Sequence, residues 1–123
     1  FPAGIGAAVA FPEKTVVCIS GDGSFQMNLE ELAVCKDYNL NVKIMILNNG
    51  YLGMVRQLQE KSYGGRYSET KISNPDFLKL AESYGIGARR VSSFNEIEDA
   101  LTCAFSTDDP YVVEFVVEPM ELL

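Results

Sequence analysis

Two short polar motifs contain the residues of this chain best suited to bind a ligand. The first, Gly21-Asp22-Gly23-Ser24, places an acid between two glycines, and the second is Asn48-Asn49-Gly50. Asp22 offers a hard carboxylate oxygen and Asn49 a neutral amide oxygen, which are ligand types that Mg²⁺ accepts. The glycines allow a tight turn and close backbone approach to a phosphate, while Ser24 adds a hydroxyl donor. The motifs therefore predict a magnesium site shared with a diphosphate.

Each motif alone is also a common turn signal, because Asp-Gly and Asn-Gly occur in many surface loops. Two surface turns are therefore the alternative interpretation. The joint occurrence of the motifs, each directly after an apolar run, favours the ligand site.

The elements that must position these motifs can be predicted from apolar runs. Four runs are expected to be strands: residues 15–20, 41–47, 87–92 and 111–117. The first two are apolar enough to be buried on both faces of a sheet. Because ligands bind outside the carboxyl ends of parallel strands, the two motifs should face one crevice if their strands are neighbours.

Helical patterns separate the strands. Residues 27–36 and 93–105 are expected helices, the second opened by a capping box of Ser93 and Glu96. A third helix, residues 75–84, should carry Pro75 at its first position and end at Gly85. The small residues at 1–10 suit a closely packed helix, and residues 61–73 are the one plausible long loop.

This alternation predicts an α/β fold, a doubly wound (Rossmann-like) parallel sheet with helices on both faces. At 123 residues and 47% hydrophobic composition, residues 1–123 should form one domain. The formal net charge of −7 and the scattered basic residues argue against a nucleic-acid partner. No apolar run approaches the roughly 20 residues of a membrane helix.

Three separate cysteines, Cys18, Cys35 and Cys103, are expected to be reduced core thiols in a reducing compartment such as the cytoplasm. No basic leader precedes the apolar residues at the start, which predicts that no signal peptide is present. The abrupt start in "FPAGIGAAVA" is expected for a piece of a longer protein.

The sequence "GDGSFQMNLEELAVCKDYNLNVKIMILNNGYLGMVRQ" carries the GDG…NN pattern of the thiamine diphosphate motif and closely resembles acetohydroxyacid (acetolactate) synthase catalytic subunits. The similarity extends from "PAGIGAAVAFP" to "YVVEFVVEP", essentially the whole chain. It implies the C-terminal, thiamine diphosphate-binding domain of a longer enzyme.

The resemblance also implies roles for individual residues. Mg²⁺ would be held by the side chains of Asp22 and Asn49 and by the main-chain carbonyl of Tyr51. The diphosphate would contact Gly21, Gly23 and Ser24. The middle of the cofactor and the reacting carbon would be lined by Leu52, Gly53 and Met54.

Enzymes of this family decarboxylate a 2-oxo acid such as pyruvate and join the two-carbon unit to a second 2-oxo acid. Their activating glutamate comes from the pyrimidine-binding domain of a partner subunit, so this chain should be inactive alone and act in a homo-oligomer. Glu30 and Glu31 are interpreted as solvated helix residues. FAD is possible in the full-length enzyme but not in this domain.

One position departs from the family pattern. Leu58 stands where synthases of branched-chain amino-acid synthesis usually carry tryptophan, and it lies four residues after Met54 on the same helix face. The resemblance therefore predicts a substrate pocket of Met54 and Leu58 with little preference for 2-oxobutanoate. A simple apolar contact is the alternative for Leu58. For the whole chain, the alternatives are another thiamine diphosphate-dependent decarboxylase, oxidase or lyase, or a non-catalytic module.

Several other residues keep two interpretations. Met27 and Met45 are most simply core residues, and a role in binding the cofactor is the alternative. The loop around Arg66 is either a mobile lid or merely solvated. Arg56, on the helix after the second motif, could meet a substrate carboxylate or a surface acid.

Overall fold

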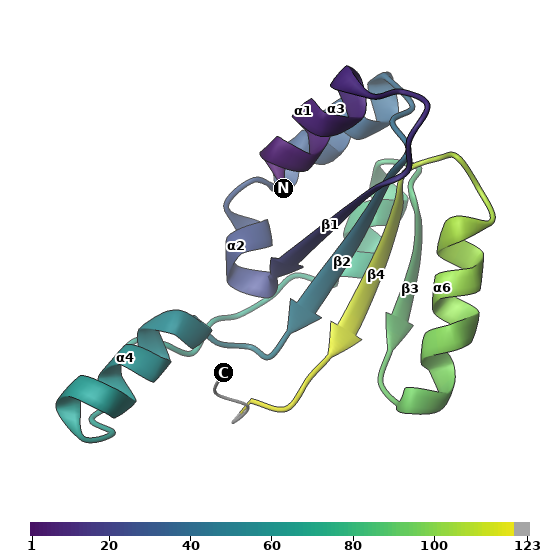
Figure 1. The fold of residues 1–123 in the computed structure, drawn as a ribbon. Coiled ribbons are helices and arrows are strands. Elements are labelled where there is room, and N and C mark those ends of the chain that lie inside the picture. Colours follow the sequence, from purple (N-terminus) through teal and green to yellow (C-terminus); the bar gives the residue numbers. More distant parts are fainter. Residues whose placement is uncertain (120–123) are drawn as a thin grey trace.

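The computed structural model describes residues 1–119 and contains a four-stranded, all-parallel sheet (Figure 1). The spatial order is β1-β2-β4-β3. The strands are β1 (Val16–Gly21), β2 (Val42–Asn48), β3 (Gly87–Val91) and β4 (Tyr111–Val116). All four predicted strands are confirmed, each to within one residue at either end.

Residues 1–119 form six helices, and helices from this set cover both faces of the sheet. They are α1 (Pro2–Ala10), α2 (Asp22–Gln26), α3 (Leu32–Asp37), α4 (Gly53–Tyr63), α5 (Phe77–Ser83) and α6 (Ile97–Phe105), with 3₁₀ turns η1 (Leu29–Glu31) and η2 (Phe94–Glu96). The larger core contains residues of α1, α3 and α5, and the smaller core is formed under α6. The predicted doubly wound α/β fold with helices on both faces is confirmed.

The larger core is centred on aromatic side chains. Phe25 and Phe77 are each 1% exposed and pack edge to face, with ring centroids 5.7 Å apart. On the opposite face, Met45 and Val113 of the central strands pack against Ala100 of α6. Met45 is thus a core residue, as predicted.

The helix starts differ from the sequence-based expectations. The predicted helix at 27–36 is the turn η1 followed by α3, and Met27 is 71% exposed, so its interpretation as a core residue is wrong. Phe25 on the short helix α2 fills the core position instead. The capping box of Ser93 and Glu96 is present ahead of α6, as predicted.

Pro75 is not the first residue of α5. Asp76 caps this helix, because its Oδ1 accepts hydrogen bonds from the N–H groups of Leu78 and Lys79, and Pro75 precedes the cap. Gly85 ends the helix with a φ of +68°, as predicted. The long loop is shorter than expected, since α4 continues to Tyr63.

β1 is half-buried on one face and exposed on the other, which corrects the expectation of burial on both. It is an edge strand, and Val17 and Ile19 are 47% and 70% exposed. On this face of the sheet, α6 packs over β3 and β4. The apolar side chains of β1 therefore remain accessible on that side.

The three cysteines are free thiols. Cys35 lies in the core, and burial raises its pKa to about 11, whereas Cys18 and Cys103 are half-buried. Across the described part of the chain, no helix is long and apolar enough to cross a membrane.

Candidate functional site

The two polar motifs meet at the carboxyl ends of adjacent strands. Gly21 ends β1, Asn48 ends β2, and Gly21 pairs with Leu47 in the parallel register. The predicted common crevice follows directly from this pairing. The first motif continues into α2, so Asp22, Gly23 and Ser24 form the first turn of a short helix.

A cavity of about 570 Å³ opens between these motifs. All nine residues that the resemblance assigns to the cofactor line it: Gly21, Asp22, Gly23, Ser24, Asn49, Tyr51, Leu52, Gly53 and Met54. Sequence reasoning missed five further lining residues: Met27, Leu47, Val55, Val117 and Glu118. The cavity thus combines a polar end at the motifs with an apolar wall at the start of α4.

Asp22 is the buried acid of this cavity, with 2% of its surface exposed. Its Oδ2 accepts hydrogen bonds from the Gly50 N–H at 2.9 Å and from Asn74 Nδ2 at 2.7 Å. Among residues 1–119, no hydrogen bond to Oδ1 competes with a ligand. The carboxylate is therefore held through one oxygen while the other is available.

The second motif forms a tight loop. Asn49 Oδ1 accepts the Tyr51 N–H at 3.0 Å, and Gly50 has a φ of +71°, a conformation that favours glycine. This loop brings the Asn49 side chain and Tyr51 to the cavity beside Asp22. The three groups that the resemblance assigns to the metal lie on one cavity as a result.

A metal at this place would need ligands from outside the chain. Residues 1–119 contain no cluster of three or more His, Cys, Asp or Glu side chains that could hold a metal ion. One carboxylate and one amide suit Mg²⁺ when phosphate oxygens complete its octahedron. An added Cβ at Gly21 would meet nothing within 4 Å, so the backbone there is open to a large ligand. The residues present fit a magnesium diphosphate.

Sequence reasoning missed two polar residues behind Asp22, Asn74 and Glu114, and the contacts that Asn48 makes with them. Asn74 and Asn48 contact each other at 2.8 Å, and Asn48 donates to the buried carboxylate of Glu114. The only sequence signal for Glu114 is a charge in the apolar run "YVVEFVV", and Asn74 carries no signal beyond preceding a proline.

Arg56 of α4 is buried between two aromatic rings. Its guanidinium carbon lies 4.2 Å from the ring centroid of Tyr51 and 4.8 Å from that of Tyr67, and Nη1 donates to the Pro119 carbonyl. Because Tyr67 belongs to the loop after α4, these contacts fasten that loop to the helix. Arg56 therefore organises the loop in this structure.

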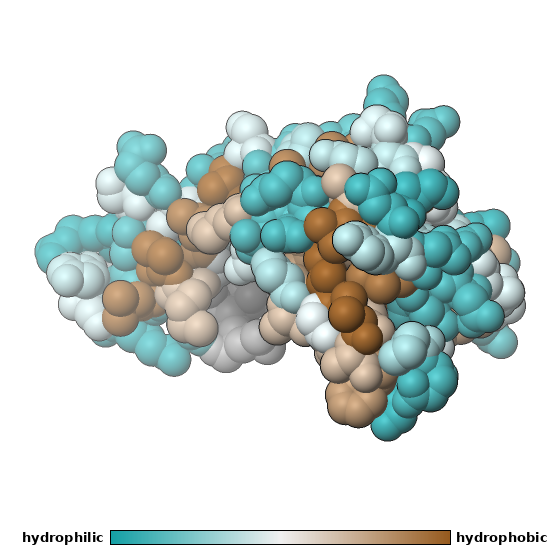
Figure 2. Space-filling model, turned by 90° about the horizontal axis from the view of Figure 1, so that it is seen from above, coloured by the Kyte–Doolittle hydropathy of each residue, from teal (hydrophilic) through white to brown (hydrophobic). Residues whose placement is uncertain are grey.

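The opposite side of α4 is apolar and accessible. Met54, Val55 and Leu58 are 80%, 44% and 57% exposed. Helix α4 projects away from the sheet, and hydrophobic side chains gather over it in the view from above (Figures 1 and 2). Leu58 does not line the cavity that Met54 lines, and it lies one turn further along the helix.

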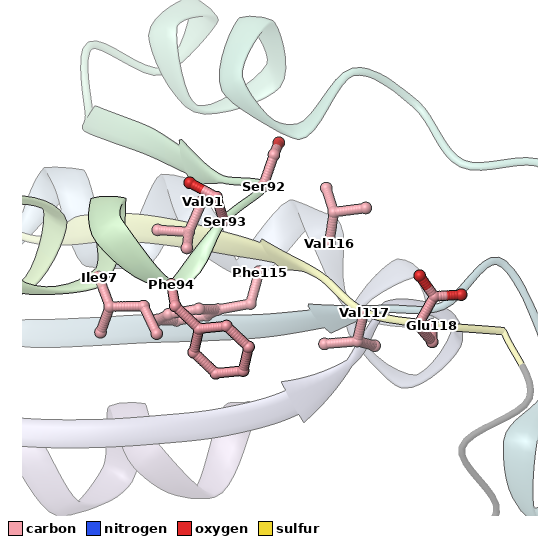
Figure 3. A pocket seen from close by; sticks show the side chains of 9 residues that line it. All are labelled: Val91, Ser92, Ser93, Phe94, Ile97, Phe115, Val116, Val117 and Glu118. Carbon is pink, nitrogen blue, oxygen red and sulfur yellow. The ribbon is translucent and has the colours of Figure 1, made fainter.

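A second cavity of about 280 Å³ lies at the carboxyl ends of β3 and β4 (Figure 3). Its lining is mainly apolar, and Phe94 is 90% exposed at its edge. Val117 and Glu118 line both cavities, so the two are adjacent. Glu118 is its single charged side chain, which gives it little chemistry of its own.

Comparisons with known proteins agree with this geometry. Residues 1–115 match the family model described as thiamine pyrophosphate enzyme, C-terminal TPP binding domain. The probable acetolactate synthase large subunit of Methanococcus aeolicus is 49% identical over all of this chain and 21% of its own length. Acetolactate synthase isozyme 2 large subunit of Escherichia coli is 46% identical over 98% of this chain and 22% of its own.

A solved structure shares the fold. The thiamine diphosphate-dependent 4-hydroxybenzoylformate decarboxylase of Rhodococcus jostii aligns with a TM-score of 0.89 and 30% identity, over 96% of this chain and 22% of that one. The chain spans about a fifth of the length of the relatives that it matches.

Proposed function

Because the chain belongs to the thiamine pyrophosphate enzymes, as the C-terminal domain that binds this cofactor, we propose that it is the diphosphate- and magnesium-binding domain of an acetolactate synthase-like carboligase. The observation that carries the proposal is the cavity at the ends of β1 and β2. It brings together the acid and both glycines of the first motif with Asn49 of the second. The identities of 49% and 46% to acetolactate synthase large subunits favour that reaction within the family.

Different residues along the cavity would bind the metal and the diphosphate. Asp22 and Asn49 would hold Mg²⁺ through their side chains and Tyr51 through its carbonyl, while Gly21, Gly23 and Ser24 would contact the diphosphate. When bound, thiamine diphosphate supplies the carbanion that attacks the carbonyl carbon of a 2-oxo acid.

The apolar part of the cavity has a separate role. Leu52, Met54 and Val55 form an apolar wall that would exclude water from the reacting end once another surface covers it, and a dry environment favours decarboxylation. The protein's proposed contribution is thus to orient the cofactor and to keep water from its reacting end.

We also propose that the activity needs more than residues 1–123. The wall formed by α4 is open, and Glu30 and Glu31 lie outside the cavity, so neither is placed to activate the cofactor. A pyrimidine-binding domain of a partner subunit would supply that glutamate and close the apolar side. The active form would then be a homo-oligomer of a longer chain.

A second candidate is a thiamine diphosphate-dependent decarboxylase that releases an aldehyde. The fold shared with the 4-hydroxybenzoylformate decarboxylase favours it. Both reactions begin with decarboxylation, so the acceptor of the two-carbon unit distinguishes them.

The test supplies pyruvate to the complete polypeptide with thiamine diphosphate and Mg²⁺ and measures acetolactate, acetaldehyde and carbon dioxide. We expect acetolactate as the main product, no turnover without cofactor or metal, and no turnover by residues 1–123 alone. Acetaldehyde as the main product would favour the decarboxylase, and turnover by the isolated chain would refute the division between subunits.

A further inference from the structure

A polar chain links the Asp22 carboxylate to the middle of the sheet, and the cofactor contacts proposed above leave its other members unused. Asn74 Nδ2 donates to Asp22 Oδ2 at 2.7 Å and to Asn48 Oδ1 at 2.8 Å. Asn48 Nδ2 donates to Glu114 Oε1 at 2.7 Å. Arg90 Nε donates to Glu114 Oε2, also at 2.7 Å. This series of hydrogen-bonded side chains joins β2, β4, β3 and the segment before α5.

The buried carboxylate of Glu114 fixes the direction of these hydrogen bonds. Glu114 is 2% exposed, and both of its oxygens are acceptors, Oε2 from Arg90 Nε and Oε1 from Asn48 Nδ2. Asn48 must therefore turn its NH₂ group toward Glu114, which leaves its Oδ1 facing Asn74. Asn74 in turn must present its own NH₂ group, and that group also reaches Asp22.

Two further contacts lock the same arrangement. Gln26 Nε2 donates to Asn74 Oδ1 at 2.5 Å, which keeps the Asn74 amide from turning over. The Gly50 N–H lies 2.9 Å from Asp22 Oδ2 and 3.1 Å from Asn48 Oδ1. Both donors to Asp22 therefore converge on Oδ2, and Oδ1 is the oxygen left for a cation.

We propose that Asn74 is a positioning residue for the metal: its amide, oriented by Glu114 through Asn48, holds the Asp22 carboxylate so that Oδ1 faces the cation. The inference rests on the proposed function, because it presupposes that Asp22 binds Mg²⁺. Partners that orient a metal ligand commonly change metal affinity by tenfold to a hundredfold. Removing the oriented donor should therefore lower the affinity for the metal more than it lowers the stability of the fold.

The competing explanation is purely structural. Asn74 also ties the segment before α5 to α2 through Gln26, so its loss could loosen the domain as a whole. That explanation predicts a lower unfolding temperature and weaker binding of both metal and thiamine diphosphate. The positioning role predicts a loss confined to the metal.

The experiment uses the complete polypeptide with Mn²⁺ in place of Mg²⁺ and measures free Mn²⁺ by electron paramagnetic resonance. The metal is titrated at saturating thiamine diphosphate, and thiamine diphosphate is then titrated at saturating metal. Asn74→Asp keeps the shape but replaces the donor with an acceptor, so we expect the metal dissociation constant to rise roughly tenfold to a hundredfold. The thiamine diphosphate constant at saturating metal should change less than about twofold.

Asn41→Asp is the matched control. Asn41 also donates to an aspartate, Asp108 Oδ1 at 3.0 Å, but at the amino end of β2, away from the cavity. Glu114→Gln is the second variant, because it preserves the size of the side chain while freeing the Asn48 amide to turn over. It should raise the metal constant by a smaller factor than Asn74→Asp, and Asn41→Asp should leave it unchanged.

The outcomes separate the inference from the proposed function. Wild-type binding of Mn²⁺ that depends on thiamine diphosphate, with an unchanged constant in Asn74→Asp, would overturn the positioning role and leave the proposed function standing. Equal losses in both titrations together with a lowered unfolding temperature would also overturn it. Absence of cofactor-dependent metal binding in the wild type would overturn both.

Discussion

The two sides of the cavity are built differently. Around Asp22, a nearly buried carboxylate has two donors on one oxygen, and the amides behind it form a continuous chain to Glu114. Along α4, the apolar side chains of Met54 and Leu58 are more than half exposed, and the helix stands away from the sheet (Figure 1). The hydrogen bonds that hold the polar side are formed within this chain, whereas the apolar side lacks a covering surface among residues 1–119.

Substitutions on the two sides should therefore have different effects. Changes on the polar side act on groups that are already in place, so their effects should appear in metal and cofactor binding. Changes on α4 act on a surface that another domain would complete, so their effects should appear in substrate choice and hardly in the stability of this domain.

The largest effect is expected at Asp22, the acid of the polar side. Asp22→Ala removes the only anionic protein ligand proposed for Mg²⁺, so magnesium-dependent binding of thiamine diphosphate should be abolished. Asn49→Ala removes a neutral ligand and should weaken binding less. Calorimetric titration of the complete polypeptide measures both, and an unaltered affinity in Asp22→Ala would refute the assignment.

The stabilities of the two regions should also differ. Phe77 is 1% exposed beneath the polar side, and Phe77→Ala should lower the free energy of unfolding by about 3–5 kcal/mol. Leu58→Ala, on the exposed face of α4, should change it by less than about 0.5 kcal/mol. Urea unfolding of both variants measures the contrast. Similar losses would mean that α4 is packed into the domain after all.

Substrate choice is the readout for α4. Leu58→Trp adds a flat aromatic wall on the face that carries Met54, and discrimination of one methyl group is worth roughly 1–3 kcal/mol. We expect the wild-type protein to make mainly acetolactate and the variant to shift toward the product of 2-oxobutanoate. Competition between pyruvate and 2-oxobutanoate gives the ratio. An unchanged ratio would show that Leu58 does not select the substrate.

The smallest effect concerns the cap of α5 beside the polar chain. The Lys79 N–H that donates to the Asp76 carboxylate lowers its pKa, and the charge of Arg90 lowers it further. A lowered pKa in the folded state stabilises the fold above the ordinary pKa, and this contribution is lost as the pH falls through the folded value.

Asp76→Asn keeps a capping side chain but removes the charge. Its denaturation midpoint should lie below that of the wild type at about pH 6, and the two midpoints should converge in acid. A difference that persists undiminished at low pH would contradict the role of the charge.

The parts of the structure that were predictable are local patterns. The strands were predicted because a short apolar run between two helical patterns has few other structures open to it. The meeting of the two motifs followed from the parallel sheet. The exposed face of β1 was not predicted, because an apolar run does not reveal that its strand lies at the edge. Met27 was wrongly predicted to be a core residue, because its spacing fits one helix over residues 27–36, whereas the structure divides this region into α2, η1 and α3.

The polar chain behind Asp22 was invisible in the sequence for a different reason. Asn74 lies 52 positions from Asp22, and Glu114 lies 66 from Asn48, so no spacing rule connects them. The contacts exist only because β4 lies beside β2 and the segment before α5 passes the carboxyl ends of β1 and β2. Ligands that follow a strand can be predicted from motifs, but the residues that orient them depend on the tertiary fold.

The central claim is that the polar side of the cavity is the metal site. A crystal structure of the complete polypeptide with thiamine diphosphate and Mn²⁺, located by its anomalous scattering, tests this claim most directly. We predict one metal ion bound by Asp22 Oδ1, the Asn49 side-chain oxygen, the Tyr51 carbonyl and two diphosphate oxygens, with Asn74 still donating to Asp22 Oδ2. A metal bound elsewhere, or one bound without Asp22, would contradict the account.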